Sequence, residues 1–212
     1  MSKCIHVVYI NNYFPELWRL TLPTIERYAR RIGSDLNIIT KRKYPKWHIY
    51  YEKIQVYDDG TNYDFNFLVD ADILVHHEFP DFSTIIKPYH AGINDSFDAN
   101  KLFNIENNIY FERDGRNVGL ASNAVITSRH THDLWTPLDI TPEEANAISQ
   151  PKGSNPDEYC ISLNLAKFGL KYNGITWESW QRYFLVHTGT GGNRKDTLDY
   201  AQATLKFWAS GK

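Results

Sequence analysis

Apolar residues occur in short runs along the chain, and most of these runs have the length of a β-strand. In the first half, strands are predicted at Ile5 to Ile10, Leu36 to Thr40, Phe67 to Val75 and Tyr89 to Ile93. Between the first two, apolar positions recur at helical spacing from Glu16 to Ile32, where Gly33 supplies the stop and Pro23 is expected to kink the middle. A shorter helix that carries Lys53 is predicted from Tyr51 to Tyr57.

The second half of the chain is less regular. Its predicted elements are a strand at Ala121 to Thr127, a helix at Pro156 to Phe168, strands at Lys171 to Ile175 and Tyr183 to Val186, and a helix at Leu198 to Trp208. Residues Ser96 to Gly119 are polar and lack periodicity, which is typical of a loop region. Strands that alternate with helices and then give way to mixed elements predict an α/β fold with a mostly parallel central sheet flanked by helices. The 212 residues suit one domain, with two small domains as the alternative.

Composition and charge exclude several classes of protein. The net charge of -2 gives no basic field that would collect phosphates, so no nucleic acid partner is expected. No apolar segment approaches the roughly 20 residues that span a bilayer, so membrane insertion is not expected either. Two cysteines, Cys4 and Cys160, cannot form a disulfide framework, which favours a reducing compartment and a cytoplasmic location.

Two aspartates interrupt the apolar run from Phe67 to Val75, which reads F-L-V-D-A-D-I-L-V. Asp70 and Asp72 would be costly at the end of a buried strand unless something compensates their charge. A divalent cation is the natural compensator, because one carboxylate can bind it directly while the next-but-one turns toward the same side. The alternative is a turn that Asp72 caps, with Asp70 half exposed.

A histidine stands at the end of another predicted strand. His187 follows the apolar run Phe184 to Val186, and an imidazole at that place could complete an Asp/Asp/His site for Mn²⁺. The alternative is a structural histidine, which is the commoner role for a single one.

The segment after His187 is rich in glycine. Gly189 and Gly191 leave the backbone free of side chains, so its N–H groups can approach a diphosphate closely. Arg194 and Lys195 follow and could neutralise the charge of such a group. A flexible surface turn is the alternative interpretation.

Taken in order, these motifs resemble the GT-A glycosyltransferases that use nucleotide sugars. The early strand, the D-x-D, the S-N-A-V at residues 122–125, the D-E pair at 157–158 and the strand-terminal histidine with its glycines carry the resemblance, which covers most of the chain from Ile5 to Lys195. The nearest likeness is to the retaining, metal-dependent families of the glycogenin, bacterial galactosyltransferase and plant xylosyltransferase types. It implies a nucleotide-binding half over about residues 1–95, an acceptor-side half over about 96–195 and a C-terminal helix at about 196–210.

The resemblance also implies roles for single residues. Asp70, Asp72 and His187 match the ligands of Mn²⁺, or Mg²⁺, which bridges to the donor diphosphate. Asn123 matches a residue near the donor sugar, and Asp157 matches the carboxylate nearest that sugar. Without the resemblance, Asn123 could equally satisfy a turn and Asp157 could stabilise the first turn of a helix.

Four further residues are expected to contact the donor. Lys53 matches a basic residue that faces the donor, and Asn11, Asn12 and Tyr13 are expected to hold the uracil. A solvated helix residue and an ordinary strand-to-helix loop are the alternatives. The chain departs from the family at Glu158, where glutamine is common, and in the glycine and lysine spacing after the histidine, which leaves the phosphate contacts there open.

These matches predict an enzyme that moves a hexose or deoxyhexose from a UDP-sugar to a glycan hydroxyl. Retention follows from the resemblance, whereas inversion would follow if Asp157 acts as a base on the acceptor. A phosphatase of the haloacid-dehalogenase kind is the rival enzyme, but Ile73 and Leu74 stand where that family has glycine and threonine. A carbohydrate-binding domain without turnover is the non-enzyme alternative. A likeness to amino-terminal glycosyltransferase domains of chlorella virus multidomain proteins implies a viral protein in the host cytoplasm, with further domains after Lys212.

Overall fold

The computed structural model describes residues 1–94, 120–150, 155–175, 184–189 and 193–210. In chain order the elements are β1 (Lys3–Val8), α1 (Pro15–Ile32), β2 (Asp35–Ile39), the 3₁₀-helix η1 (Ile49–Gln55), α2 (Val56–Asp59), β3 (Phe65–Val69), β4 (Ile73–Val75), α3 (Phe82–Ile85), β5 (His90–Asn94), β6 (Ala121–Ser128), the 3₁₀-helix η3 (Arg129–Trp135), α5 (Pro142–Ser149), α6 (Pro156–Lys167), β7 (Lys171–Gly174), β8 (Leu185–His187) and α7 (Arg194–Ala209). In this part of the chain, no helix is long and apolar enough to cross a bilayer.

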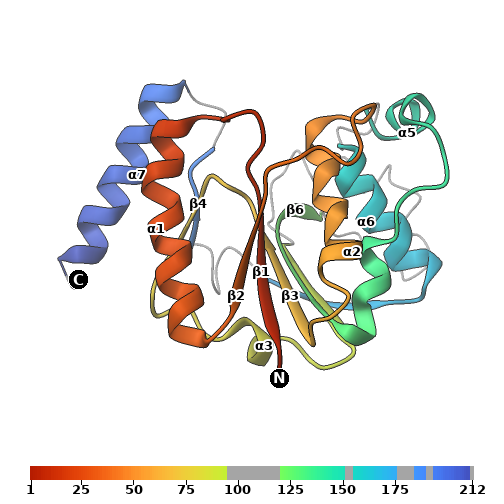
Figure 1. The fold of residues 1–212 in the computed structure, drawn as a ribbon, viewed down its shortest axis with the longest axis horizontal. Helices are drawn as coiled ribbons and strands as arrows, with labels where there is room; N and C mark the ends of the chain where they lie inside the picture. The colour runs from red at the N-terminus through yellow and green to blue at the C-terminus, as the bar shows by residue number, and fades with distance from the viewer. Residues whose placement is uncertain (95–119, 151–154, 176–183, 190–192, 211–212) are drawn as a thin grey trace.

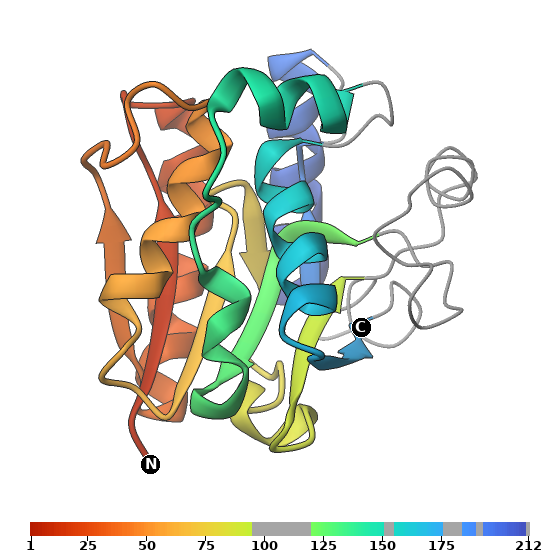
Figure 2. The same ribbon diagram turned by 90° about the vertical axis from the view of Figure 1, so that its right-hand side faces the viewer.

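A six-stranded sheet in the order β2-β1-β3-β6-β5-β7 forms the centre of the fold. β1 pairs in parallel with β2 and β3, and β5 pairs in parallel with β7, whereas β6 runs antiparallel to both of its neighbours. β4 and β8 form a separate two-stranded antiparallel sheet. Helices α1 and α7 lie on one side of the central sheet, and η1, α2, η3 and α6 lie on the other (Figures 1 and 2). The mostly parallel α/β architecture expected from the sequence is confirmed.

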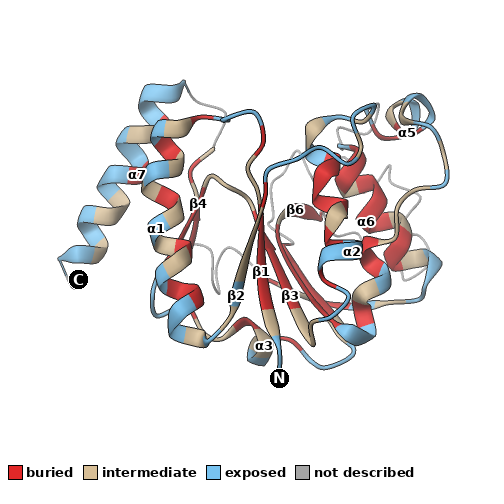
Figure 3. Ribbon diagram, in the orientation of Figure 1, coloured by how far each residue is buried: buried red, intermediate tan, exposed pale blue. Residues whose placement is uncertain are grey.

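Helices cover both faces of the central sheet, which explains why its central strands are apolar throughout. In β3, Phe67 and Val69 belong to the cluster under α1, while Leu68 belongs to the cluster under η1 and α6. Figure 3 shows buried residues along the strands and on the inner faces of the helices, with exposed residues on the outer faces. Close packing of the two apolar clusters holds the sheet rigid, so residues at the ends of its strands have fixed positions.

Helix α1 matches its predicted span almost to the residue. Phe14 at its start is in the left-handed conformation, Pro15 opens the first turn, and the chain continues as helix through Pro23. Gly33 ends the helix with φ of 62°, and the N–H of Ser34 donates to Ala29 at 3.0 Å. A left-handed residue with this bonding is the usual helix terminus for glycine.

The run from Phe67 to Val75, expected as one strand, is two strands in two different sheets. β3 ends at Val69, and β4 starts at Ile73 and pairs with β8. Asp70 and Asp72 therefore lie in the turn between the strands, where their carboxylates are not forced into an apolar face.

Sequence periodicity also missed or shortened some elements. η3 and α5 were not predicted, although both begin with a capping box, one of which reads T-P-E-E at residues 141–144. Helix α7 begins at Arg194 rather than Leu198, and β8 includes His187. The polar region predicted from Ser96 to Gly119 lies outside the described residues.

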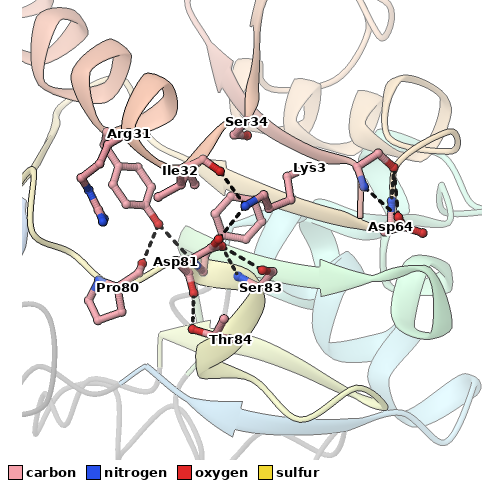
Figure 4. A network of polar contacts seen from close by, with 12 residues as sticks. Lys3, Arg31, Ile32, Ser34, Asp64, Pro80, Asp81, Ser83 and Thr84 are labelled. Atoms are coloured by element: carbon pink, nitrogen blue, oxygen red, sulfur yellow. Dashed lines mark hydrogen bonds and ion pairs between the residues drawn. The ribbon is translucent and has the colours of Figure 1, made fainter.

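A polar network closes the end of the sheet where β1 begins (Figure 4). The Lys3 ammonium donates to Asp81 at 2.5 Å and to the carbonyl of Ile32 at 2.6 Å, which ties β1 to the end of α1. Asp81 in turn accepts from the N–H of Ser83 at the start of α3, and Tyr28 donates to Pro80. This end of the sheet is thus occupied by structural contacts, and the opposite end remains for a site.

Candidate functional site

A cavity of about 550 Å³ lies where β1 and β3 end and β6 begins. Because β6 is antiparallel to β3, its first residues lie beside the last residues of β3. Residues from seven segments line the cavity: Val8, Ile10 and Tyr13; His48, Ile49, Tyr50 and Lys53; Asp70, Ala71 and Asp72; Asn94; Ala121, Ser122 and Asn123; Asn155, Asp157 and Glu158; His187 and Gly189. Eight of the thirteen residues singled out in the sequence are among them.

The metal-ligand candidates meet at one side of this cavity. One ligand atom from each of Asp70, Asp72 and His187 lies within 4.8 Å of the other two. The Nε2 atom of His187 lies 3.4 Å from a carboxylate oxygen of Asp72. Two carboxylate oxygens and one imidazole nitrogen form a donor set that suits Mn²⁺.

Electrostatics at this group favour a cation. Burial raises the pKa of the Asp70 carboxyl, and the neighbouring Asp72 adds to the rise although Lys53 opposes it. For Asp72, burial also opposes ionisation, but the hydrogen bond and charge of His187 outweigh it and lower the pKa. Burial disfavours the charged imidazole of His187, yet Asp72 outweighs it and raises the pKa. Asp70 and Asp72 lie close together beside the Lys53 ammonium and the His187 imidazole, and a divalent ion bound between the two carboxylates would reduce their mutual repulsion.

Contacts from the start of β4, from α1 and from Thr188, the residue after β8, fix the backbone of the aspartate turn. The carbonyl of Asp70 accepts from the N–H of Ile73 at 3.1 Å, and the carbonyl of Ala71 accepts from the Thr21 hydroxyl of α1 at 2.6 Å. Thr188 binds the carbonyl of Asp72 twice, through its N–H at 3.0 Å and its hydroxyl at 2.6 Å. The two carboxylates therefore stand on a turn with little freedom, as a preorganised site requires.

Glycine is required next to this turn. A Cβ atom on Gly189 would lie 2.0 Å from the Oδ2 atom of Asp72 and 3.4 Å from Nε2 of His187. No side chain fits there, so bare backbone faces the metal-ligand candidates. This close approach supports the fit of a metal and its phosphate partner to the residues present.

Lys53 is buried between two carboxylates. Its Nζ lies 2.8 Å from Asp70, 3.3 Å from Asp157 and 3.0 Å from the hydroxyl of Ser122. Burial disfavours its charge, but the attraction of Asp70 and Asp157 outweighs burial and raises the pKa of the ammonium. Lys53 is therefore a fixed positive charge that joins the metal-ligand side of the cavity to the Asp157 side.

Asn123 and Asp157 lie on the second side of the cavity. The side-chain carbonyl of Asn123 accepts from the amide of Asn94 at 2.8 Å, and its backbone carbonyl accepts from the N–H of Asp70 at 2.9 Å. Asp157 stands in the first turn of α6, between Asn155 and Glu158, which form the capping box of this helix. Asn94 and Ser122 were not singled out in the sequence, although Asn94 ends an apolar run and Ser122 adjoins Asn123.

Aromatic side chains form part of the cavity wall. Tyr13 and Tyr50 are about half exposed, and the rings of His48 and Tyr50 lie 4.4 Å apart. Exposed ring faces are suited to stacking against a base or a sugar. Tyr50 and His48 had no motif that would mark them in the sequence.

Four of the remaining candidates are not among the described residues that line the cavity. Asn11 and Asn12 are exposed in left-handed conformations, with φ of 58° and 51°, and Asn12 accepts from the Tyr9 hydroxyl. Arg194 and Lys195 are exposed in the first turn of α7, where the Arg194 guanidinium lies 5.0 Å from the Phe14 ring centre. Gly191 lies outside the described residues.

The mixed central sheet, with an acidic turn at the end of β3, is a GT-A-like fold, as expected from the sequence. A glycosyltransferase involved in the glycosylation of the major capsid of PBCV-1 matches with a TM-score of 0.59 at 10% identity, over 96% of this chain and all of that chain. The bifunctional glycosyltransferase WbbM, in its apo form, matches with a TM-score of 0.50 at 8% identity, over 81% of this chain and 38% of that one. No protein-family model and no curated protein matches the sequence. At these identities the likeness is one of fold.

Proposed function

We propose that the chain is a metal-dependent glycosyltransferase that moves a hexose or deoxyhexose from a UDP-sugar to a glycan hydroxyl. The observation that carries the proposal is the Asp70–Asp72–His187 group beside Gly189, on the wall of a cavity that also holds Asp157. The two solved structures reported above are glycosyltransferases, and a volume of about 550 Å³ is within the usual range for small-molecule sites.

Asp70, Asp72 and His187 would hold the metal. The imidazole favours Mn²⁺ over Mg²⁺, which prefers oxygen ligands. When bound, such an ion supplies positive charge against the diphosphate that leaves with the nucleotide. The bare backbone at Gly189 would let the phosphates approach, while the rings of Tyr13 and Tyr50 would receive the base.

Asp157 and Asn123 would act on the sugar. A carboxylate at this place can stabilise an oxocarbenium-like transition state or remove a proton from the acceptor hydroxyl. Lys53 would keep the charge of Asp157 balanced and hold it near the donor, because its ammonium bridges Asp70 and Asp157. We propose net retention of the anomeric configuration, which ¹H NMR of the product would report directly.

The test is release of UDP from a panel of UDP-sugars, with and without glycan acceptors, in Mn²⁺ and after chelation. We expect UDP to be released from at least one donor. This release should need Mn²⁺ and should be lost in Asp72→Ala. Asp64→Ala is the matched control, because Asp64 stands before β3 at its opposite end and binds the N–H of Ser2. Release of phosphate from a monoester without release of UDP would instead indicate a phosphatase, and glycan binding without any release would indicate a binding domain.

A further inference from the structure

A serine hydroxyl lies inside the charged network of the site. Ser122 is the second residue of β6 and is 4% exposed. Its Oγ donates to the Oδ2 atom of Asp157 at 2.5 Å and accepts from the Lys53 ammonium at 3.0 Å. The hydroxyl therefore uses its single proton on the carboxylate and one of its lone pairs on the lysine.

The two oxygens of Asp157 have different surroundings. Oδ2 receives the Ser122 hydroxyl and lies 3.3 Å from Lys53, whereas Oδ1 has no hydrogen-bond partner among the described residues. Asp157 as a whole is 1% exposed. A buried carboxylate oxygen without a partner is costly and needs an explanation, which a bound group that donates a hydrogen bond to it would supply.

Lys53 alone would not distinguish these oxygens. Its ammonium is nearer to Asp70, at 2.8 Å, and its contact with Asp157 is longer. The terminal torsion of an aspartate is broad, so a carboxylate held only by a point charge can turn either oxygen toward it. The short bond from Ser122 is directional and selects Oδ2.

We infer that Ser122 is the positioning residue of Asp157: it holds Oδ2 and so keeps Oδ1 as the acceptor for a hydroxyl of the bound sugar. This inference rests on the proposed glycosyl transfer. Ser122 acts through Asp157 and Lys53, and its effect is on the orientation of the carboxylate during transfer rather than on the metal or the nucleotide.

Steady-state kinetics of Ser122→Ala and Ser122→Thr test the inference. Loss of a hydrogen bond to a charged group is expected to lower kcat of Ser122→Ala roughly 10- to 100-fold. The Kd of UDP in Mn²⁺ should stay within about twofold, because the diphosphate does not rely on Asp157. Ser122→Thr keeps the hydroxyl and should recover most of kcat. Ser128→Ala is the matched control, since Ser128 is a buried serine of the same strand that donates to Pro88 at 2.7 Å.

A kcat of Ser122→Ala within about twofold of the wild type would overturn the inference, as would an equal loss in folded Ser122→Thr. Crystal structures of the wild type and Ser122→Ala give a readout that does not need turnover. The inference predicts that the Asp157 carboxylate turns and that Lys53 closes on it in the variant. An unmoved carboxylate overturns the inference even if the wild type is active, whereas a wild type without any donor turnover contradicts the proposed function.

Discussion

The two aspartates of the acidic turn have different basic partners. Asp70 pairs with the buried ammonium of Lys53, while Asp72 pairs with the imidazole of His187, although the two aspartates are one residue apart. Their side chains are 23% and 15% exposed, so neither pair is a surface ion pair of little consequence. Asp70 therefore belongs to the metal-ligand group and is also linked, through the Lys53 ammonium, to Asp157.

Asp157→Asn tests the role of its carboxylate in transfer. We expect near-normal donor affinity with kcat lowered by roughly 100-fold or more, because the charge is removed where charge develops in the transition state. Stopped assays of UDP release with donor titration separate kcat from KM. Glu144→Gln, in the exposed first turn of α5, is the control for a lost helix-dipole interaction. Unchanged turnover in Asp157→Asn would remove Asp157 from the mechanism.

Gly189→Ala tests whether bare backbone is needed beside the metal-ligand candidates. Its Cβ would lie 2.0 Å from Asp72, so the carboxylate must move and Mn²⁺-dependent binding of UDP should fall by at least tenfold. Gly33→Ala is the control, because its strain at positive φ should lower stability without affecting binding. Titration calorimetry measures binding and thermal denaturation measures stability. Normal UDP binding by Gly189→Ala would contradict the proposed site.

Helices and strands could be predicted from the sequence where residues close together in the chain determine them. Helix α1 was predicted because its apolar spacing and its terminal Gly33 are local signals. The division of the run Phe67 to Val75 into two strands was not predicted, because apolar residues continue on both sides of the aspartates. Only the pairing of β4 with β8 places the second part of the run in a separate sheet. The antiparallel direction of β6 likewise depends on partners distant in the sequence.

The same distinction applies to the site. Asp70, Asp72 and His187 could be selected as metal-ligand candidates because a polar residue that interrupts or ends an apolar run is visible in the sequence. Ser122 and Tyr50 were missed, since a serine in a strand or a tyrosine near a short helix has no special spacing. Asn11 and Asn12, which are expected at the uracil, are exposed in the left-handed loop after β1 and are not among the residues that line the cavity.

Thr188→Val tests how the residue after β8 supports the aspartate turn. The variant loses the hydroxyl bond to the Asp72 carbonyl while keeping side-chain shape, which should cost about 1 kcal/mol of unfolding free energy. Because the turn is then held by fewer contacts, UDP binding in Mn²⁺ should weaken severalfold. Thr127→Val is the control, since it loses a comparable buried bond, from Trp135 at 2.9 Å, away from the site. Equal UDP binding by both variants would show that the turn does not need Thr188.

In the described part of the molecule, the central sheet has polar groups at both ends of its strands and a buried polar network around His6. His6, fully buried in β1, accepts from the Asn37 amide through Nδ1 at 3.2 Å and lies 2.9 Å from the Asn66 carbonyl through Nε2. Asn37 also donates to Asp59. The imidazole is thus held neutral, with its proton on Nε2, by amide side chains from the two strands that flank β1.

This histidine should make the stability of the fold depend on pH. Burial lowers the pKa of His6 below its ordinary value of 6.5, although its bond to Asn66 and the charge of Asp59 oppose the shift. Its contribution is therefore complete above 6.5 and is lost as pH falls below 6.5 toward the pKa in the folded state, by up to about 1.4 kcal/mol per pH unit. Urea denaturation across this range, compared with His6→Gln, measures it. An equal fall in the variant would assign the dependence to other groups.

The proposed function depends most on a divalent ion that joins the Asp70–Asp72–His187 group to a nucleotide diphosphate. Titration calorimetry of the wild-type chain with UDP, in Mn²⁺ and after chelation, tests this claim most directly, with Asp72→Ala as the matched variant. We expect UDP to bind in Mn²⁺, and we expect this binding to be lost on chelation and to be absent from folded Asp72→Ala. Binding of UDP that is equally strong without the metal, or is retained in Asp72→Ala, would contradict it.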